Sequence, residues 1–534
     1  MEFAICHDMT DPMGRLWARA QRYLAQGDLA PALATLDSMR ARMPTHARTH
    51  LLAAQIAWRN DEVRTAASEA LEAARLADEP EGILDVTEVL LLTGEVAAAH
   101  ECIERLSLDA IESHETLIRC ADLRQELGEH GDSLALLDKA LPGTPRDAKL
   151  HFYRAQQLAF LGRLREAEAG YETSLDLAPS YGRAALPLVR LRRQTLQDNH
   201  LGRLETGLAA VASGTRDHAA LEFARYKVLE DLQQYAGAWE ALARANAIMS
   251  AQSGQDAARQ HAALRSLYDI SAEFASQSAE SVPHGPQPIF VIGLPRSGTT
   301  VLERLLGNHA EVVSAGELAS FGQQLRWAAN HRHFHDQVFA DRIGKLDWVE
   351  LGKRYLAQTQ WRASGKRYFI DKQPVNWMVA GWLHAALPGS RILHMVRDPM
   401  DVCFSNYRAM FGDAYTWSYQ LDSLAQHYHD YRRLVSRWHE LVPGAILDVS
   451  YADLVSETEN TLRGVLDFCG LEWEPACVDI TLNDRPVSTL SAAQVHEPLH
   501  ARSIGAWRPY GEHLVELFTS ISKMHESART SVRT

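Results

Sequence analysis

The order of hydrophobic and polar positions changes once along the chain, close to residue 275. Before that point, apolar residues recur every three or four positions in segments rich in Ala, Leu, Arg and Glu, a spacing that predicts amphipathic helices. The stretch SQSAESVPHGPQP at 276–288 is polar and contains proline, which is typical of a linker. We therefore predict an all-α domain over 12–275, a linker over 276–287 and a second domain over 288–525.

Short apolar runs alternate with helical segments in the second domain. Runs of this length between turn residues are typical of buried strands, and their alternation with helices favours an α/β fold with a parallel sheet and helices on both faces. The predicted strands lie at 288–293, 367–372, 391–396 and 445–450.

The first half contains a repeat. Five turn positions, each followed five residues later by a small residue, are spaced 34, 33, 34 and 34 residues apart. The pairs are Gly27 and Ala32, Asp61 and Ala66, Gly94 and Ala99, Gly128 and Ser133, and Gly162 and Ala167. In three units a proline follows the turn after 17 residues, at Pro44, Pro145 and Pro179. A generic helical bundle has no reason to keep this register.

A period of 34 residues with this pattern resembles the tetratricopeptide repeat, a helix-turn-helix unit that stacks into a solenoid. The segment 232–245 resembles a later unit. The resemblance implies a concave face that binds a peptide or a protein, or alternatively a surface for forming a homodimer. Nothing in this half suggests catalysis.

Composition and charge narrow the function of the whole chain. Its 534 residues carry a net charge of −14, which argues against a general nucleic-acid or anionic-membrane binder. Its six cysteines include no Cys-x-x-Cys pair, so neither a disulfide framework nor a zinc site is predicted. We see no signal peptide and no apolar run long enough to span a membrane, so we expect a cytoplasmic protein.

The segment PIFVIGLPRSGTT at 288–300 is the first candidate site, because a strand runs through a glycine loop into a helix. Backbone N–H groups at such a helix start bind anions. The loop nearly matches G-x-x-x-x-G-K-[ST], but Thr299 replaces the lysine that reaches the β- and γ-phosphates of a nucleoside triphosphate. We therefore expect a ligand with a single phosphate or a phosphosulfate at this end, and a nucleotide kinase is disfavoured. A ligand-free turn is the alternative.

The segment RDPMDVCFS at 397–405 is the second candidate site. It follows a predicted strand, and Ser405 lies on the predicted helix eight residues after Arg397. A guanidinium and a hydroxyl in this arrangement can clamp an anion. The alternative is a surface arginine capped by Asp398.

Together these two segments resemble the PAPS-dependent sulfotransferase superfamily, whose donor is 3′-phosphoadenosine 5′-phosphosulfate. The resemblance covers about 288–512. It implies that Arg397 and Ser405 bind the 3′-phosphate of the donor. It also implies that the loop wraps the 5′-phosphosulfate, so that no lysine is needed there. The loop residues are Pro295, Arg296, Ser297, Gly298, Thr299 and Thr300.

Two further segments are similar to the tyrosylprotein sulfotransferase branch. NHAEVVSAGEL places Glu317 at the position of that branch's general base, and YFIDKQPVNW places Lys372 at the position of the lysine that faces the transferring group. A surface or capping role for Glu317, and an ordinary strand-end role for Lys372, are the alternatives.

Nearer the C-terminus, Tyr451 and Ser491 match family positions that contact the donor. Arg502 and Arg508 are further candidates for neutralising phosphates. The basic residue that often precedes the family's tryptophan is replaced by Ala506, which is a departure from the pattern.

The resemblance therefore predicts a PAPS-dependent enzyme that transfers a sulfuryl group to a hydroxyl, without a metal. Glu317 would take the acceptor's proton, while Arg296, Lys372 and Ser491 would stabilise the transferring and leaving groups. A protein or peptide tyrosine, and a glycan, lipid or metabolite hydroxyl, are both open as acceptors. A solenoid adaptor whose second half only binds a nucleotide is the non-catalytic alternative.

One cluster favours a different chemistry. His331, His333 and His335 alternate along the chain and could bind a metal, although a solvated polar segment is the simpler interpretation.

Overall fold

The computed structural model describes residues 12–107, 111, 113–254, 256–272, 285–334, 336–483, 485–488 and 498–531. The chain forms two compact units that do not follow chain order. The first contains the residues up to Leu136 together with Ala319–Trp361, and the second contains Leu137–Leu318 together with the residues from Arg362 onward. Most of the predicted linker, 276–284, lies outside the described residues, so the domain bounds stay a prediction.

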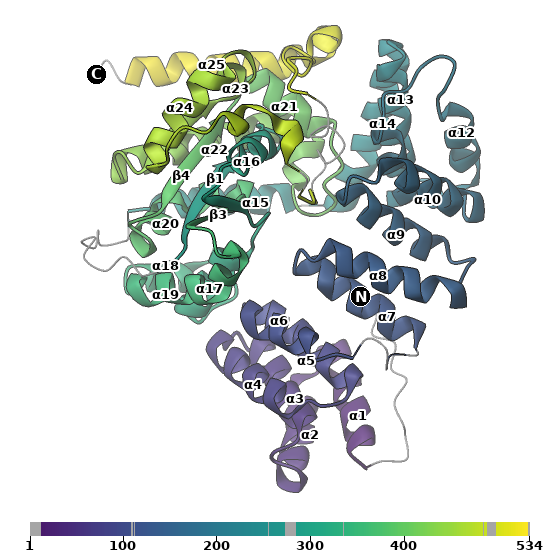
Figure 1. The fold of residues 1–534 in the computed structure, drawn as a ribbon, viewed down its shortest axis with the longest axis vertical. Helices are drawn as coiled ribbons and strands as arrows, with labels where there is room; N and C mark the ends of the chain where they lie inside the picture. The colour runs from purple at the N-terminus through teal and green to yellow at the C-terminus, as the bar shows by residue number, and fades with distance from the viewer. Residues whose placement is uncertain are drawn as a thin grey trace. The chain divides into compact units, whose positions relative to one another are not determined.

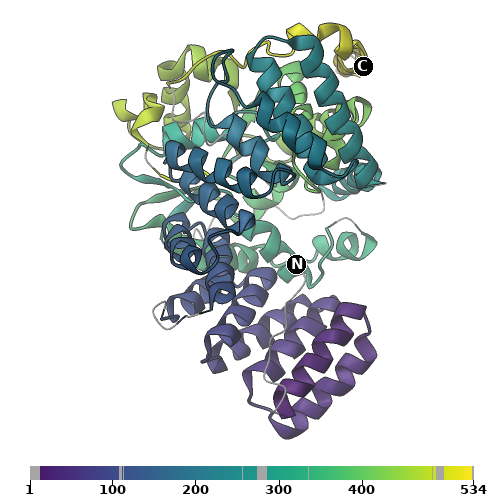
Figure 2. The same ribbon diagram turned by 90° about the vertical axis from the view of Figure 1, so that its right-hand side faces the viewer.

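Antiparallel helical hairpins fill the first half of the chain, as the purple and blue helices of Figure 2 show. In the first unit they begin with α1 (Pro12–Gln26), α2 (Leu29–Arg42), α3 (Ala47–Arg59), α4 (Val63–Leu76), α5 (Pro80–Thr93), α6 (Val96–Glu104) and α7 (His114–Glu126). Helix α8 (His130–Ala140) ends in the second unit. There they continue with α9 (Ala148–Phe160), α10 (Leu164–Leu177), α11 (Gly182–Arg190), α12 (Leu201–Ala210), α13 (Arg216–Asp231), α14 (Tyr235–Ser253) and α15 (Asp256–Ile270).

The predicted turns have the backbone conformation that the repeat requires. Gly27, Asp61, Gly94, Gly128 and Gly162 all have a positive φ, between 66° and 85°. The small residue five positions later is at most 1% exposed in every unit, because it lies where the two helices of a hairpin meet. The tetratricopeptide-like repeat is therefore confirmed. The later unit follows the same rule, with Gln233 at a φ of 59° and Ala238 fully buried.

Three helices from the middle of the chain complete the first unit. They are α17 (Ser320–Ala329), α18 (Gln337–Ile343) and α19 (Trp348–Thr359). The backbone carbonyl of Gly94, at the turn between α5 and α6, accepts a hydrogen bond of 2.7 Å from Gln324 of α17. A methyl group added to Gly94 would lie 2.8 Å from Cβ of Gln323, so the glycine also permits this close packing. The segment between the second and third strands thus packs on the early repeats.

A five-stranded parallel sheet forms the centre of the second unit (Figure 1). Its strands are β1 (Gln287–Gly293), β2 (Val312–Ser314), β3 (Tyr368–Asp371), β4 (Arg391–Val396) and β5 (Ile446–Ser450), in the order β2-β3-β1-β4-β5. The four predicted strands are confirmed with bounds shifted by at most one residue, and β2 was not predicted. In register, Phe290 of β1 lies beside Asp371 of β3 and Ile392 of β4.

Helices cover both faces of this sheet, as predicted. On one face Leu302 and Leu306 of α16 (Thr299–Leu306) and Leu462 and Val465 of α24 (Thr458–Cys469) share a core with β1, β3, β4 and β5. On the other face His394 of β4 contacts the Tyr431 hydroxyl of α22 (Leu421–Leu441) at 2.5 Å. The remaining helices are α20 (Ala380–Ala386), α21 (Pro399–Tyr407), α23 (Tyr451–Ser456) and α25 (Val515–Ser531).

Short 3₁₀ helices connect these elements, at Gln360–Ala363, Pro374–Val379, Thr416–Tyr419, Pro475–Val478, Ile480–Leu482 and Arg508–Leu514. Among the described helices, none has both the length and the apolar character needed to cross a membrane.

The order of the strands indicates where a ligand would bind. From β1 the chain continues to β2 and β3 on one side of β1, and β4 lies on its other side. In open α/β sheets, ligands bind at such a switch point, beyond the carboxyl ends of the strands. The predicted loops after β1 and β4 both begin there.

Candidate functional site

The loop after β1 has a backbone shape that its sequence dictates. Gly293, Arg296 and Gly298 have φ values of 148°, 68° and 107°. A Cβ on Gly298 would lie 2.4 Å from the ring of Tyr451, which no side chain could tolerate. Glycine therefore allows both the left-handed turn and the contact between the loop and Tyr451.

Helix α16 begins directly at this loop, with Gly298 as its N-cap. No side chain caps the helix, and the backbone N–H groups of Thr299 and Thr300 have no acceptor within the described part of the chain. Unpaired N–H groups and the positive end of the helix dipole favour an anion at this point.

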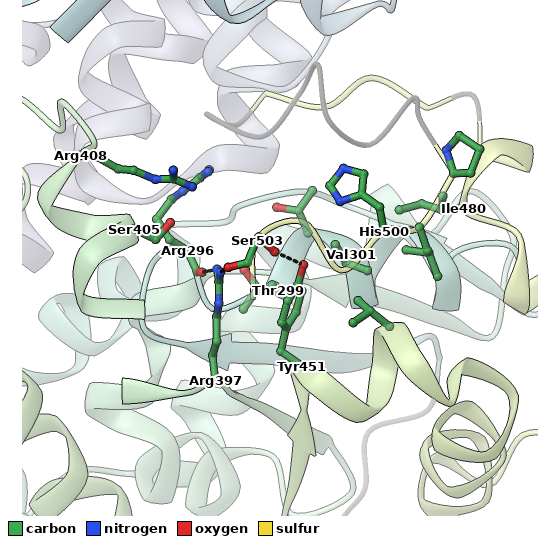
Figure 3. Close-up of a pocket in the computed structure, with 15 residues that line it drawn as sticks. Arg296, Thr299, Val301, Arg397, Ser405, Arg408, Tyr451, Ile480, His500 and Ser503 are labelled. Atoms are coloured by element: carbon green, nitrogen blue, oxygen red, sulfur yellow. Dashed lines mark hydrogen bonds between the residues drawn. The ribbon is translucent and has the colours of Figure 1, made fainter. Parts of the chain in front are cut away.

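Most of the predicted donor-binding residues come together in one pocket (Figure 3). Those that line it are Arg296, Gly298, Thr299, Thr300, Arg397, Ser405 and Tyr451. Its other lining residues include Val301, Arg408, Ile480, His500 and Ser503. The two motifs, about a hundred residues apart in sequence, therefore form a single site at the ends of β1 and β4.

Arg397 connects three segments that line the pocket. Its guanidinium donates hydrogen bonds of 2.7 Å to the backbone carbonyls of Arg296 and Ser503 and lies over the ring of Tyr451 at 4.8 Å. The Tyr451 hydroxyl in turn contacts Oγ of Ser503 at 2.8 Å. Asp398 caps α21 by accepting from the N–H of Asp401 at 3.0 Å, rather than pairing with Arg397. The alternative of a surface arginine capped by Asp398 is therefore wrong.

Positive charge is concentrated here. Burial, together with repulsion from the neighbouring Arg190, Arg408 and Arg397, lowers the pKa of Arg296 to about 9. Burial also lowers the pKa of Arg397. Arg408 shows the opposite shift because Glu230, at 3.2 and 3.3 Å, outweighs the effect of burial and raises its pKa. A bound anion would relieve the repulsion among these cations.

Glu317 and Lys372 form a second cluster. Lys372, whose side chain is 1% exposed, forms an ion pair with Glu317 and lies 3.7 Å from the buried carboxylate of Glu303. Glu303 also accepts from the hydroxyl of Ser314, and burial raises the pKa of its carboxyl group. Glu303 and Thr299 are four residues apart on α16, so they lie on the same side of that helix. The pair is thus adjacent in structure to the loop helix, although neither residue lines the pocket of Figure 3.

The remaining predicted residues lie in different places. The carbonyl of Pro295 accepts a hydrogen bond of 2.8 Å from Asn406, which links the loop to α21, and Ser297 is buried. Arg502 and Arg508 are exposed and do not line the pocket. Ser491 lies outside the described residues.

Sequence reasoning missed several residues of this region. Arg408 lies three residues after Ser405, so helical spacing from a known site residue could have found it. Glu303 could have been found in the same way, because it lies one helical turn after Thr299. Arg190 carries no such signal, because only the fold brings the repeat helix α11 to the end of α21.

The histidine segment has a structural explanation. His331 is 4% exposed and forms ion pairs with Asp61 of the repeats and with Asp336, so it is buried rather than solvated. The groups of described side chains close enough to share a metal ion are His394 with His439 and Asp448, and His100 with Glu104 and Glu129. His331 belongs to neither, and His335 lies outside the described residues.

Comparisons with known proteins agree with this geometry. Residues 288–475 match the sequence model of the sulfotransferase family. An uncharacterized protein of Aquifex aeolicus is 27% identical over 383 residues, which are 67% of this chain and 48% of that protein. The chain thus spans about half the length of this relative. A protein of Caenorhabditis briggsae named putative protein-tyrosine sulfotransferase is 22% identical over 237 residues, covering 41% of this chain and 80% of that protein.

Among solved structures, the sulfotransferase domain from the curacin biosynthetic pathway is 16% identical to this chain. The match has a TM-score of 0.27 and covers 42% of this chain and 98% of that domain. From the family match and the site, the α/β part of this chain is a sulfotransferase domain, and it follows tetratricopeptide-like repeats.

Proposed function

We propose that this chain is an enzyme that takes a sulfuryl group from 3′-phosphoadenosine 5′-phosphosulfate and transfers it to an acceptor hydroxyl. The observation that carries the proposal is the single pocket in which the glycine loop, Arg397 and Ser405 meet. It combines helix N–H groups that have no partner among the described residues with clustered guanidinium groups. A donor with phosphate groups at both its 5′ and 3′ positions matches two separate anion sites.

The residues present fit this donor. The donor supplies an activated sulfuryl group, held by a phosphate that can leave. The N–H groups of Thr299 and Thr300 would bind the 5′-phosphosulfate, and Arg397 with Ser405 would bind the 3′-phosphate. Nε of Arg397 is buried and has no partner in the described part of the chain, so it is a donor still open to a ligand.

Glu317 would act as the general base. Its side chain is 38% exposed, so an acceptor can reach it, and Lys372 holds it in place. Glu317 would take the proton of the acceptor hydroxyl as the new O–S bond forms. Arg296, Lys372 and Ser491 would stabilise charge on the sulfuryl oxygens and the leaving phosphate, and these cations would make a metal unnecessary.

We propose a tyrosine of a protein or peptide as the acceptor. The name of the Caenorhabditis briggsae relative supports this choice, as does the presence of repeats that could recruit a polypeptide. A glycan, lipid or metabolite hydroxyl is the alternative. The repeats could instead bind a second copy of the chain.

The test is isothermal titration of the full chain with 3′-phosphoadenosine 5′-phosphate, the product nucleotide. We expect micromolar affinity for this nucleotide and no comparable affinity for ATP. Arg397→Ala should weaken binding by at least about tenfold, because charge-assisted hydrogen bonds of this kind contribute about 1.5–3 kcal/mol. Arg391→Ala, at the start of the strand that Arg397 follows, is the matched control and should bind normally.

Equal binding of ATP, or no binding of either nucleotide, would contradict the assigned donor. The adaptor and kinase alternatives would then be favoured. Nucleotide binding without transfer to any tyrosine-containing peptide would instead leave the donor assignment intact and remove tyrosine as the acceptor.

A further inference from the structure

Three repeat helices of the second unit contact the end of α21, the helix that carries Ser405. Arg190, the last residue of α11, donates to the backbone carbonyl of Arg408 at 3.4 Å. Glu230 of α13 forms the ion pair with the Arg408 guanidinium. Asn246 of α14 donates to the carbonyl of Tyr407 at 3.1 Å. The repeats therefore hold the segment of the sulfotransferase domain that borders the pocket.

The charges at this contact are unbalanced. Four guanidinium groups lie near one another, those of Arg190, Arg296, Arg397 and Arg408. Among these neighbours, Arg190 has the largest effect in lowering the pKa of Arg296. Glu230 pairs with Arg408, but neither Arg190 nor Arg397 has an ion pair with a carboxylate among the described residues. Burial, followed by repulsion from Arg408, lowers the pKa of Arg190 to about 10.

A buried group of like charges is costly unless an anion is bound nearby. Arg408 and Ser405 line the pocket, whereas Arg190 does not. Arg190 therefore acts on a ligand through the positive potential that it adds beside Arg296 and Arg408, and it is a positioning residue rather than a contact residue.

We propose that the repeats are part of the donor-binding site: Arg190 strengthens binding of the donor's 3′-phosphate, and Glu230 opposes it by neutralising Arg408 in the free protein. This inference rests on the proposed function, because it takes the ligand to be a nucleotide with a 3′-phosphate. It gives the repeats a role beyond recruiting an acceptor or a second copy.

The experiment compares full-length variants by titration with 3′-phosphoadenosine 5′-phosphate and with adenosine 5′-phosphate, which lacks the 3′-phosphate. Arg190→Gln should weaken binding of the first nucleotide about five- to tenfold, as expected for the loss of one charge in a poorly solvated site. Binding of the second nucleotide should change little. Arg190→Lys should restore most of the loss because it keeps the charge.

Glu230→Gln should change the affinity for the nucleotide in the opposite direction to Arg190→Gln. Removing the negative charge should tighten binding of the bisphosphate, even if the thermal stability of the protein falls, and an unchanged affinity would show that Glu230 does not oppose binding. Arg183→Gln, an exposed arginine on the same helix α11, is the matched control and should have no effect.

Two results would overturn the inference while leaving the proposed function intact. One is unchanged affinity in Arg190→Gln. The other is an equal loss in Arg190→Gln and Glu230→Gln for both nucleotides, without rescue by lysine, which would mean that the contact is purely structural. Failure of the wild-type protein to bind the bisphosphate would overturn the proposed function and this inference together.

Discussion

At the scale of single residues, Glu317 tests whether the site is catalytic. The contact between Glu317 and Lys372 could not be predicted from their spacing, because the two residues are 55 positions apart in the sequence. Lys372 also forms an ion pair with Glu303, and burial raises the pKa of the Glu303 carboxyl group. A mostly buried ammonium group between two carboxylates can hold one of them, Glu317, ready for an acceptor while the other stays inside the protein.

We predict that Glu317→Gln lowers sulfuryl transfer to a tyrosine-containing peptide by about 10²–10⁴-fold, the usual contribution of a general base. The affinity for 3′-phosphoadenosine 5′-phosphate should not change, because Glu317 does not line the proposed donor pocket. Glu311→Gln, an exposed carboxylate earlier in the same segment, is the control. Retained turnover in Glu317→Gln would remove the base assignment.

The pocket at the ends of β1 and β4 could be predicted from sequence only where a motif is local. The glycine loop predicted Gly298, Thr299 and Thr300 because strand, turn and helix follow one another directly. Arg190 could not be predicted this way, because its position depends on how the repeat helices pack on α21.

At the scale of elements, sequence predicted the long, strongly patterned ones and missed the short one. Helix α16 begins at Thr299 as expected, because a glycine loop fixes its start. Strand β2 has only three residues and two apolar side chains, Val312 and Val313, so its apolar run is too short to identify a strand. Strand β2 is extended because it pairs with β3, not because its own sequence favours a strand.

The repeat turns allow a matched test of backbone strain. Gln233 is exposed and has a φ of 59°, a left-handed conformation that costs a residue with a side chain about 1–2 kcal/mol. Gln233→Gly should therefore stabilise the protein, partly offset by the greater freedom of glycine in the unfolded chain. At the equivalent Gly27, where an added Cβ would meet nothing within 4 Å, Gly27→Ala should destabilise it by about 1 kcal/mol.

Thermal unfolding measures both variants, and the signs should be opposite. A lower melting temperature for Gln233→Gly would mean that its side chain makes a stabilising interaction that outweighs the strain. The repeat would then depend on that residue itself rather than on the turn alone.

At the scale of the whole molecule, compact units do not coincide with the predicted domains. The sequence change near residue 275 marks where helices give way to strands, but it does not say which helices pack together. The helices α17 to α19 follow β2 in sequence and yet belong with the first repeats. Such long-range packing cannot be deduced from local patterns of hydrophobic residues.

Glu95 is the residue on which this packing can be tested. It is 4% exposed at the start of α6, forms an ion pair with Arg354 of α19 and accepts from Gln358 at 3.0 Å. Arg354 also lies over the ring of Trp327 at 3.8 Å. Breaking a buried ion pair by removing one partner typically costs about 3–5 kcal/mol, since the other charge stays buried and unpaired.

We therefore predict that Glu95→Ala lowers hydrogen-exchange protection of α17 and α19, measured by mass spectrometry on the full chain, while protection of the sheet strands β1 and β4 is unchanged. Glu101→Ala, an exposed carboxylate on the same helix α6, should leave all of these segments as in the wild type. If Glu95→Ala left α17 and α19 fully protected, the inserted helices would be held by apolar contacts alone. If protection of β1 and β4 also fell, the inserted helices and the sheet would unfold cooperatively, and the first unit would not be independent in stability.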